Sequence, residues 1–169
     1  MRKVLPQSFF NRDTHTAARE LLGKFIVRSY GNTEISGMIT EIEIYDGHED
    51  MASHARAGVT PRTQLMFETF GHWYVYLIYG IHYLLNITTR ESGHPAAILI
   101  RSVEGISGPG RVTKYFHINK ALNGAVSSKK SGLWIEDRGM TVKDTEIEKT
   151  PRIGVDYAGE WKDKELRLV

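Results

Sequence analysis

The order of hydrophobic and polar residues predicts one N-terminal helix followed by a series of β-strands. Asp13 or Thr14 can cap a helix whose alanines and leucines lie at helical spacing and which ends at Gly23. Alternation with a period of two then predicts a strand over 25–30 and a longer antiparallel partner over 35–45. The periodicity therefore changes from helix to strand early in the chain.

The most aromatic stretch, WYVYLIYGIHYLLNITT over 73–89, predicts two antiparallel strands with Gly80 at their turn. Tyr74 and Tyr76 share one face of the first strand, where ordinary sheet packing could account for them. Tyr79 falls at the tip of the hairpin, a place where a core residue rarely lies. The pattern therefore predicts a protruding hairpin near Tyr79-Gly80 that carries an exposed ring.

Further elements follow in the second half of the chain. Strands are predicted over 96–103, 133–136, 141–143 and 166–169, and a helical turn over 119–122. Arg101 interrupts the apolar run of the first of these strands, and an arginine there needs a partner or a water-filled cavity. The elements together predict an α+β fold with one compact domain over 1–169, built on a curved, mainly antiparallel sheet flanked by a few helices.

Composition narrows the possible chemistry. A chain of 169 residues with 41% hydrophobic residues can bury a core as one domain. The absence of cysteine excludes disulfides, thiolate zinc sites and cysteine nucleophiles. No apolar run is long enough to span a membrane, and no signal-peptide core follows Met1-Arg2-Lys3, so no membrane partner is expected. The net charge of +2 permits nucleic-acid binding if the positive charge is clustered.

A carboxylate stands beside an aromatic ring on the strand over 40–45. Ile42 and Ile44 point to one face, whereas Glu41, Glu43 and Tyr45 point to the other. A carboxylate on a rigid strand, next to an aromatic plane, is suited to activating a water beside a flat group. The alternative is an edge strand with a solvated polar face, since charged strand residues are common outside functional sites.

Two other segments carry candidate binding residues. The segment 46–66 is predicted as a long loop that holds His54, Arg56 and Arg62, and loops of this length are usually functional or disordered. The sequence GPGRVTK over 108–114 places glycines before a helical run. A helix start of this kind exposes backbone N–H groups to a phosphate, although a plain junction between loop and helix is equally consistent with the pattern.

The combination of these features indicates an enzyme that acts on a nucleic-acid base. Aromatic planes stack on bases, and an exposed ring can wedge into a duplex. Enzymes that act on a base in a duplex must extrude it into a pocket. A carboxylate in that pocket could deprotonate a water that attacks the sugar carbon, as in glycoside hydrolysis.

The chain resembles the alkyladenine (3-methyladenine) DNA glycosylase family, monofunctional base-excision enzymes that lack the helix-hairpin-helix fold. The matching stretches run in family order from Leu21 to the end of the chain. They are LLGKFIVR, TEIEIYDGHEDMASHA, TPRTQLMF, WYVYLIYGIHYLLNIT, ILIRSVEG, GPGRV and PRIGVDYAGEW…LRLV. Each stretch alone is a weak indication, but together they are highly specific.

The resemblance implies a role for each matching residue at the reaction centre. Glu43 matches the general base, and Arg101 matches the arginine that helps to hold the attacking water. Tyr45 matches one wall of the base pocket, and His54 and Tyr76 match the other wall. The tyrosines would also attract cationic lesions by cation–π interaction.

The resemblance also implies how the base and the DNA are read. His54 and the backbone of Ala52 match the groups that hydrogen-bond to the flipped base, and Asn86 matches the amide that excludes guanine. Tyr79 matches the residue inserted through the minor groove. The residues expected at the DNA backbone are Arg62, Gly110, Arg111 and Lys114.

The expected partner is double-stranded DNA with damaged purines such as 3-methyladenine, 7-methylguanine, hypoxanthine or ethenoadenine. We expect no cofactor, no metal, no lyase step and a monomer. The absence of a long N-terminal extension suggests, by analogy, a bacterial-type enzyme of the cytoplasm and nucleoid. Two alternatives stay open. One is a nucleic-acid-binding module without catalysis, and the other is a metal-dependent hydrolase that would use Glu41, Glu43, Glu49, Asp50 and His54.

Overall fold

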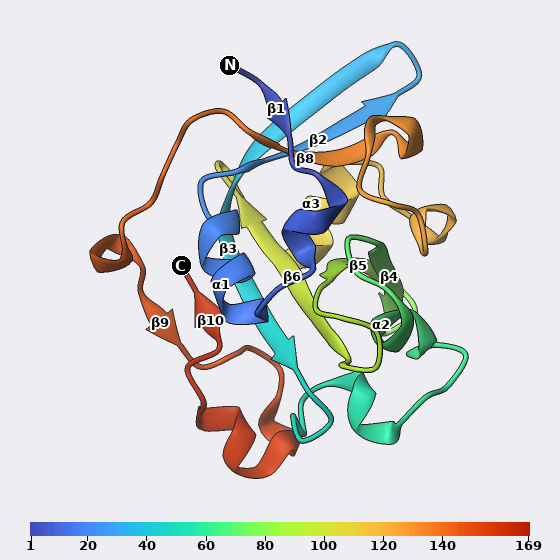
Figure 1. Cartoon of the computed structure of the whole chain (residues 1–169), viewed down its shortest axis with the longest axis vertical. Helices are drawn as coiled ribbons and strands as arrows, with labels where there is room; N and C mark the ends of the chain where they lie inside the picture. Colours follow the sequence, from blue (N-terminus) through green and yellow to red (C-terminus); the bar gives the residue numbers. More distant parts are fainter.

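The strand β3 (Thr33–Asp46) joins the two halves of the sheet. Its first half pairs with β2 (Phe25–Tyr30), and its second half pairs with β6 (Ala96–Val103). The computed structural model describes all residues, Met1–Val169, and places β3 at the centre of the 10-stranded sheet (Figure 1). The register shifts between Ile39 and Ile42, and irregularities of this kind bend a strand. The sheet is therefore curved around β3.

The main path of the sheet runs in the order β1-β8-β2-β3-β6-β5-β4, and all paired strands are antiparallel. The other strands are β1 (Lys3–Val4), β4 (Trp73–Ile78), β5 (His82–Thr88), β7 (Ile106–Ser107), β8 (Leu133–Asp137), β9 (Lys149–Thr150) and β10 (Arg167–Leu168). Short β10 pairs with both β9 and β3, and its Arg167 lies opposite Glu43. The C-terminal segment is thereby attached beside the residue predicted to be catalytic.

Helices and turns surround this sheet. The α-helices are α1 (Thr14–Leu21), α2 (Gln64–Glu68) and α3 (Pro109–Tyr115). The 3₁₀ segments are η1 (Gln7–Phe10), η2 (His54–Ala57), η3 (Lys120–Leu122), η4 (Lys129–Ser131), η5 (Asp144–Glu146) and η6 (Asp156–Asp163). Helix α1 begins as predicted, because the Asp13 side chain accepts a 2.8 Å hydrogen bond from the Thr16 N–H. No helix of the structure is long and apolar enough to cross a membrane.

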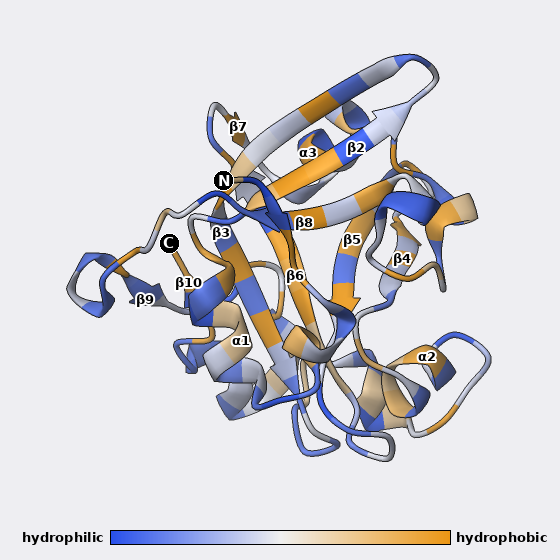
Figure 2. Ribbon diagram, turned by 45° about the horizontal axis from the view of Figure 1, so that its top comes forward, coloured by the Kyte–Doolittle hydropathy of each residue, from blue (hydrophilic) through white to orange (hydrophobic).

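The two faces of the sheet have different roles. On β6, Ile98 and Ile100 belong to the main hydrophobic core, whereas Leu99 and Arg101 face a cavity on the opposite side. On β4, Trp73 belongs to the same core, whereas Tyr74 and Tyr76 line that cavity. Hydrophilic and hydrophobic residues alternate visibly along β3 in Figure 2. The period-two pattern in the sequence therefore separates a core face from a cavity face.

The structure confirms the predicted α+β fold and the single compact domain with its antiparallel sheet and hairpins. The strand predicted over 141–143 is wrong. Val142 packs against the core from an irregular segment, and the short strand that the structure has in this region is β9, which pairs with β10. The segment 46–66, predicted as a loop, contains η2 and the beginning of α2. Neither was predicted, because helical turns this short leave no clear periodicity in the sequence.

Candidate active site

A cavity of about 710 Å³ opens on the face of the sheet opposite the main core. Strands β3, β4, β5 and β6 form its base, and η2, the start of α3 and the segment 153–157 surround it. Every residue predicted to take part in the glycosylase reaction or to contact the DNA lines this one cavity. They are Glu43, Tyr45, Ala52, His54, Arg62, Tyr76, Tyr79, Asn86, Arg101, Gly110, Arg111 and Lys114.

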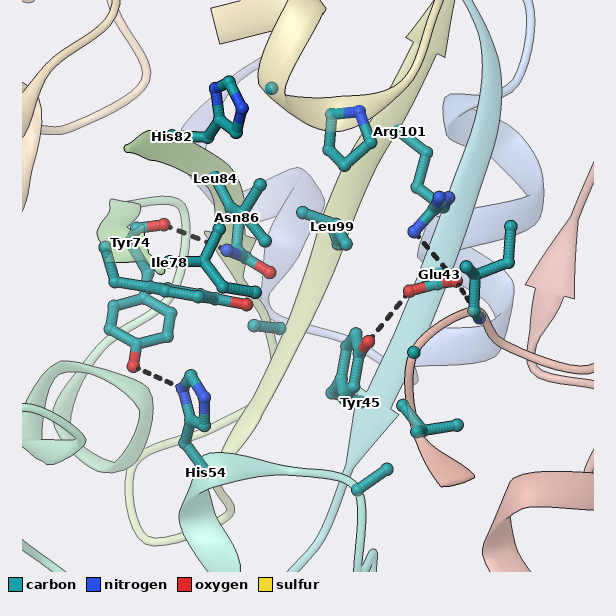
Figure 3. A pocket seen from close by; sticks show the side chains of 18 of the residues that line it. Glu43, Tyr45, His54, Tyr74, Ile78, His82, Leu84, Asn86, Leu99 and Arg101 are labelled. Carbon is teal, nitrogen blue, oxygen red and sulfur yellow. Dashed lines mark hydrogen bonds and ion pairs between the residues drawn. The ribbon is translucent and has the colours of Figure 1, made fainter. Parts of the chain in front are cut away.

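The carboxylate of Glu43 is fully buried and is held by three donors. Its Oε1 accepts a 2.8 Å hydrogen bond from the Ile153 N–H and forms a 3.2 Å ion pair with Arg101 Nη1. Its Oε2 accepts a 2.8 Å hydrogen bond from the Tyr45 hydroxyl (Figure 3). A carboxylate has about four lone-pair positions, so Glu43 keeps acceptor capacity for one further donor, such as a water.

Arg101 has the partners that its position in a buried strand requires. Besides Glu43, it donates through Nε to Glu41 Oε1 at 3.1 Å. Burial raises the pKa of Glu41, but hydrogen bonds from Ser102 and Arg167 outweigh it and hold that pKa below its usual range. Glu41 does not line the cavity, so its part in this arrangement is to fix the guanidinium of Arg101.

Aromatic rings form two opposite walls of the cavity. Tyr45 stands on one side, and His54 stands across from it beside Tyr74 (Figure 3). The His54 ring lies edge-on to Tyr76, with 4.7 Å between the ring centroids, and its Nδ1 is 3.0 Å from the Tyr74 hydroxyl. Burial raises the pKa values of Tyr45 and Tyr76, so both walls are uncharged. The space between them suits a flat, mostly apolar group.

The imidazole of His54 is neutral near pH 7. Burial, together with the positive charges of Arg62 and Arg56, lowers its pKa from 6.5 to about 4. A neutral imidazole is one donor and one acceptor, and the Tyr74 hydroxyl, which can donate or accept, can pair with Nδ1 in either tautomer. His54 can therefore read a base by hydrogen bonding but is not charged as a proton donor near pH 7.

Arginines lie over both predicted tyrosine walls. The Arg62 guanidinium lies 4.9 Å from the Tyr76 ring centroid, and that of Arg152 lies 4.7 Å from the Tyr45 ring centroid. Arg152 is buried and does not line the cavity, so it packs behind Tyr45. Arg62 is exposed at the rim, where it can also reach a phosphate.

The backbone and amide groups predicted to read the base already have partners. Asn86 is buried, and its Nδ2 donates to the Tyr74 carbonyl at 3.2 Å, which directs its side-chain oxygen into the cavity (Figure 3). The Ala52 N–H donates to Asp50 at 3.0 Å, and the Ala52 carbonyl accepts a 3.2 Å bond from the Tyr157 hydroxyl. What Ala52 can still offer a base is the second lone pair of its carbonyl.

The hairpin between β4 and β5 exposes Tyr79 at its tip, as predicted. Tyr79 is 84% exposed and has a φ of 52°, and the next residue, Gly80, has a φ of 68°. The Ile81 N–H bonds to the Ile78 carbonyl at 3.1 Å, which completes a tight turn with two left-handed residues. A left-handed conformation is uncommon for a bulky residue, and such positions cluster at functional sites.

The start of α3 lies at the mouth of the cavity. A Cβ at Gly110 would approach the His82 ring to 3.0 Å, so a larger residue here would push the His82 side chain aside. The side chains of Arg111 and Lys114 are exposed beside it and take part in no ion pair. They are free to meet an anionic partner.

Two groups that contribute to the site were not predicted from the sequence. The Ile153 N–H on Glu43 and the Tyr74 hydroxyl on His54 had no predicted role. The only indication of Ile153 was its place in the family stretch PRIGVDYAGEW, which marks a segment and not a backbone group. The residues of the metal-hydrolase alternative are dispersed, and no group of three or more His, Asp or Glu residues could hold a metal ion.

A family model described as methylpurine-DNA glycosylase matches residues 8–108 and 104–169. A relative from Legionella pneumophila (strain Lens) is 43% identical over 175 residues, covering 99% of this chain and 94% of the relative. One from Methanocella arvoryzae is 43% identical over 177 residues, covering 93% and 87%. A third, from Myxococcus xanthus, is 40% identical over 177 residues, covering 97% and 88%.

All three relatives are named provisionally as 3-methyladenine DNA glycosylases. The match extends over nearly the whole of each chain, so it includes every element that lines the cavity. This chain belongs to the methylpurine-DNA glycosylase family.

Proposed function

We propose that this protein is a monofunctional DNA glycosylase that extrudes a damaged purine from duplex DNA and hydrolyses its N-glycosidic bond. One observation carries the proposal. Glu43 lies fully buried in an aromatic-walled cavity, held by three donors, with acceptor capacity left for a water. The family and the names of the relatives support the same reaction class.

In the proposed reaction, the flipped purine stacks between Tyr45 and the wall formed by His54 and Tyr76. A water bound to Glu43 and Arg101 gives its proton to the Glu43 carboxylate as its oxygen forms a bond to the sugar C1′. The bond from C1′ to the purine nitrogen breaks, and its electron pair leaves with the base through an oxocarbenium-like transition state. The products are a free base and an abasic site.

The proposed substrates are 3-methyladenine, 7-methylguanine, hypoxanthine and ethenoadenine. The cations 3-methyladenine and 7-methylguanine depart as neutral bases and need no acid, which agrees with a neutral His54. Hypoxanthine and ethenoadenine are uncharged, so they depart as anions that take up a proton from solvent. The Asn86 amide, anchored to the Tyr74 carbonyl, would occupy the space that the exocyclic amine of guanine requires. 7-Methylguanine has the same amine and would fit less well, but as a cation it is a better leaving group than guanine. The one lysine that lines the cavity, Lys114, is exposed at its mouth, so we propose water as the nucleophile and no lyase step.

The proposed contacts with DNA lie around the mouth of the cavity. Tyr79 would enter the duplex through the minor groove and take the place of the extruded nucleotide. Arg62, Arg111, Lys114 and the backbone at Gly110 would hold phosphates on either side. The protein would act as a monomer and without a metal ion.

The test uses a labelled duplex with one hypoxanthine or one 3-methyladenine-type lesion. After incubation with the protein, hot alkali should break the lesion strand at that one site, and added chelator should leave the yield unchanged. A matched undamaged duplex is the control. Binding without strand breakage would favour the non-catalytic module, and loss of activity with chelator would favour a metal-dependent hydrolase.

A further inference from the structure

A buried ion pair lies directly behind the proposed reaction centre. Arg152 and Asp50 are both fully buried in their side chains, and they form two contacts, Nη1 to Oδ2 at 2.6 Å and Nη2 to Oδ1 at 2.8 Å. A buried ion pair is weak evidence for stability, because desolvating the two charges can cost more than their attraction returns. The position of this pair therefore calls for another explanation.

Arg152 lies next to the strand that carries Glu43 and next to two of the donors that hold its carboxylate, the Tyr45 hydroxyl and the Ile153 N–H. Its Nη1 also donates to the Ile44 carbonyl at 2.9 Å, next to Glu43 in β3. Its guanidinium lies over the ring of Tyr45, whose hydroxyl bonds to Glu43. The residue after it, Ile153, donates its N–H to Glu43. One side chain thus fixes the strand, the ring and the peptide around the carboxylate.

Asp50 extends the same arrangement to the base pocket. Its Oδ1 accepts the Ala52 N–H at 3.0 Å, and its Oδ2 accepts the Asp46 N–H at 3.4 Å, which closes the turn after β3. The loop that carries His54 follows from this turn. The ion pair therefore joins three parts of the chain: the end of β3, the loop with the base-reading residues and the C-terminal segment.

We propose that Arg152, paired with Asp50, is a positioning residue for the hydrolysis. It sets the Ile153 N–H and the Tyr45 ring, and through them the orientation of the Glu43 carboxylate. This inference rests on the proposed function for its catalytic consequence. Its structural consequence, the protection of the Ile153 N–H, can be measured without any substrate.

Two variants separate positioning from folding. Arg152→Lys keeps the charge next to Asp50 but cannot form both contacts at once. The double variant Arg152→Met with Asp50→Asn removes both charges, so no unpaired charge is buried, and the amide oxygen can still accept the Ala52 N–H. The matched control is Glu136→Gln, because Glu136 is equally buried and ion-paired to Arg2 and Arg138 but lies on β8, away from the cavity.

The measurements are the single-turnover excision rate at saturating protein, the Kd for the lesion duplex and hydrogen exchange at the Ile153 amide. In both Arg152 variants we expect the rate per folded molecule to fall on the order of 10²-fold, as small displacements of reacting groups can cause. The Kd should change little, and the Ile153 amide should lose protection. Glu136→Gln should melt at lower temperature yet keep the rate and the protection.

The positioning role of Arg152 can be contradicted by either the excision rate or the hydrogen exchange. An unchanged rate in the folded variants, or a slower rate with the Ile153 amide still protected, would overturn the positioning role. If the wild type releases no base from any lesion, the proposed function fails, and hydrogen exchange alone then decides whether Arg152 sets the Ile153 amide.

Discussion

The Tyr45 hydroxyl donates a 2.8 Å hydrogen bond to Glu43 Oε2, although both residues belong to the same strand. Their side chains project from one face of β3, and the ring of Tyr45 is long enough to turn its hydroxyl back to the carboxylate. One wall of the base pocket and the proposed general base are therefore a single hydrogen-bonded unit. Binding of the base and orientation of the carboxylate depend on the same residue.

Tyr45→Phe separates these two roles, because it keeps the ring and removes the hydroxyl. The lesion duplex should bind as it does to the wild type. Single-turnover excision should slow by about tenfold, the equivalent of one hydrogen bond to a charged group, since Ile153 and Arg101 still hold Glu43. If the Kd rises and the rate is unaffected, the hydroxyl serves binding and not the carboxylate.

Tyr79→Asn tests the proposed wedge. Asparagine tolerates the left-handed backbone found at Tyr79, so the melting temperature should stay the same or rise. Binding of a lesion duplex should weaken by about 1–3 kcal/mol, the loss of one aromatic stacking contact. A collapse of the melting temperature would instead make this ring part of the core, contrary to its 84% exposure.

The lowered pKa of His54 predicts a pH dependence of stability. Below about pH 6.5 the unfolded chain protonates this imidazole, whereas the folded protein keeps it neutral down to about pH 4. The resulting stability is therefore fully present above pH 6.5 and is lost as the pH falls towards 4. Between these values the melting temperature of the wild type should fall more steeply than that of His54→Gln.

The titration of the buried carboxylate of Glu136 does not affect the difference between the wild type and His54→Gln. The pKa of Glu136 is held at about 2, against an ordinary 4.5, because hydrogen bonds from Arg2, Trp134 and Arg138 outweigh the effect of burial, so its contribution is lost at lower pH and equally in both proteins. If the melting temperatures of the wild type and His54→Gln fall in parallel between these pH values, the pKa of His54 is not lowered by folding, and the predicted effect of burial and of the two arginines on it would be wrong.

The start of α3 gives a prediction about salt. Arg111 and Lys114 have no ion pair in the protein, so we expect each to hold one DNA phosphate. Arg111→Ala and Lys114→Ala should weaken binding to lesion and undamaged duplexes alike, and each should reduce the slope of log K against log salt by about 1. Unchanged slopes in both variants would place the phosphates elsewhere.

Much of this arrangement could be predicted from the sequence because alternation is a local property. Ile42 and Ile44 mark the core face of β3, so Glu43 and Tyr45 had to share the other face. The lone arginine of β6 indicated a polar partner for the same reason. These predictions depend only on neighbours along one strand.

The remainder depends on contacts between residues far apart in the chain. Ile153 reaches Glu43 through its backbone N–H, which no side-chain pattern reveals, and Arg152 meets Asp50 although 102 positions separate them in the sequence. The prediction of a strand over 141–143 failed because Val142 is partly buried by packing against the core and not by pairing with another strand. Periodicity cannot distinguish these two kinds of burial.

The general-base role of Glu43 is the central claim, and its neighbour Glu41 provides the matched control. Both are carboxylates of β3 bound to Arg101, but only Glu43 lines the cavity. Glutamine at either position keeps the shape of the side chain and an oxygen acceptor for Arg101. Only Glu43→Gln therefore removes the carboxylate that would take the proton from the attacking water.

The most direct test is single-turnover excision of a hypoxanthine duplex by Glu43→Gln and Glu41→Gln, with binding and melting measured on the same preparations. Glu43→Gln should fold and bind the duplex but lose roughly 10²–10⁴-fold in the chemical step. Glu41→Gln should retain most of the wild-type rate. Excision by Glu43→Gln near the wild-type rate would contradict the account.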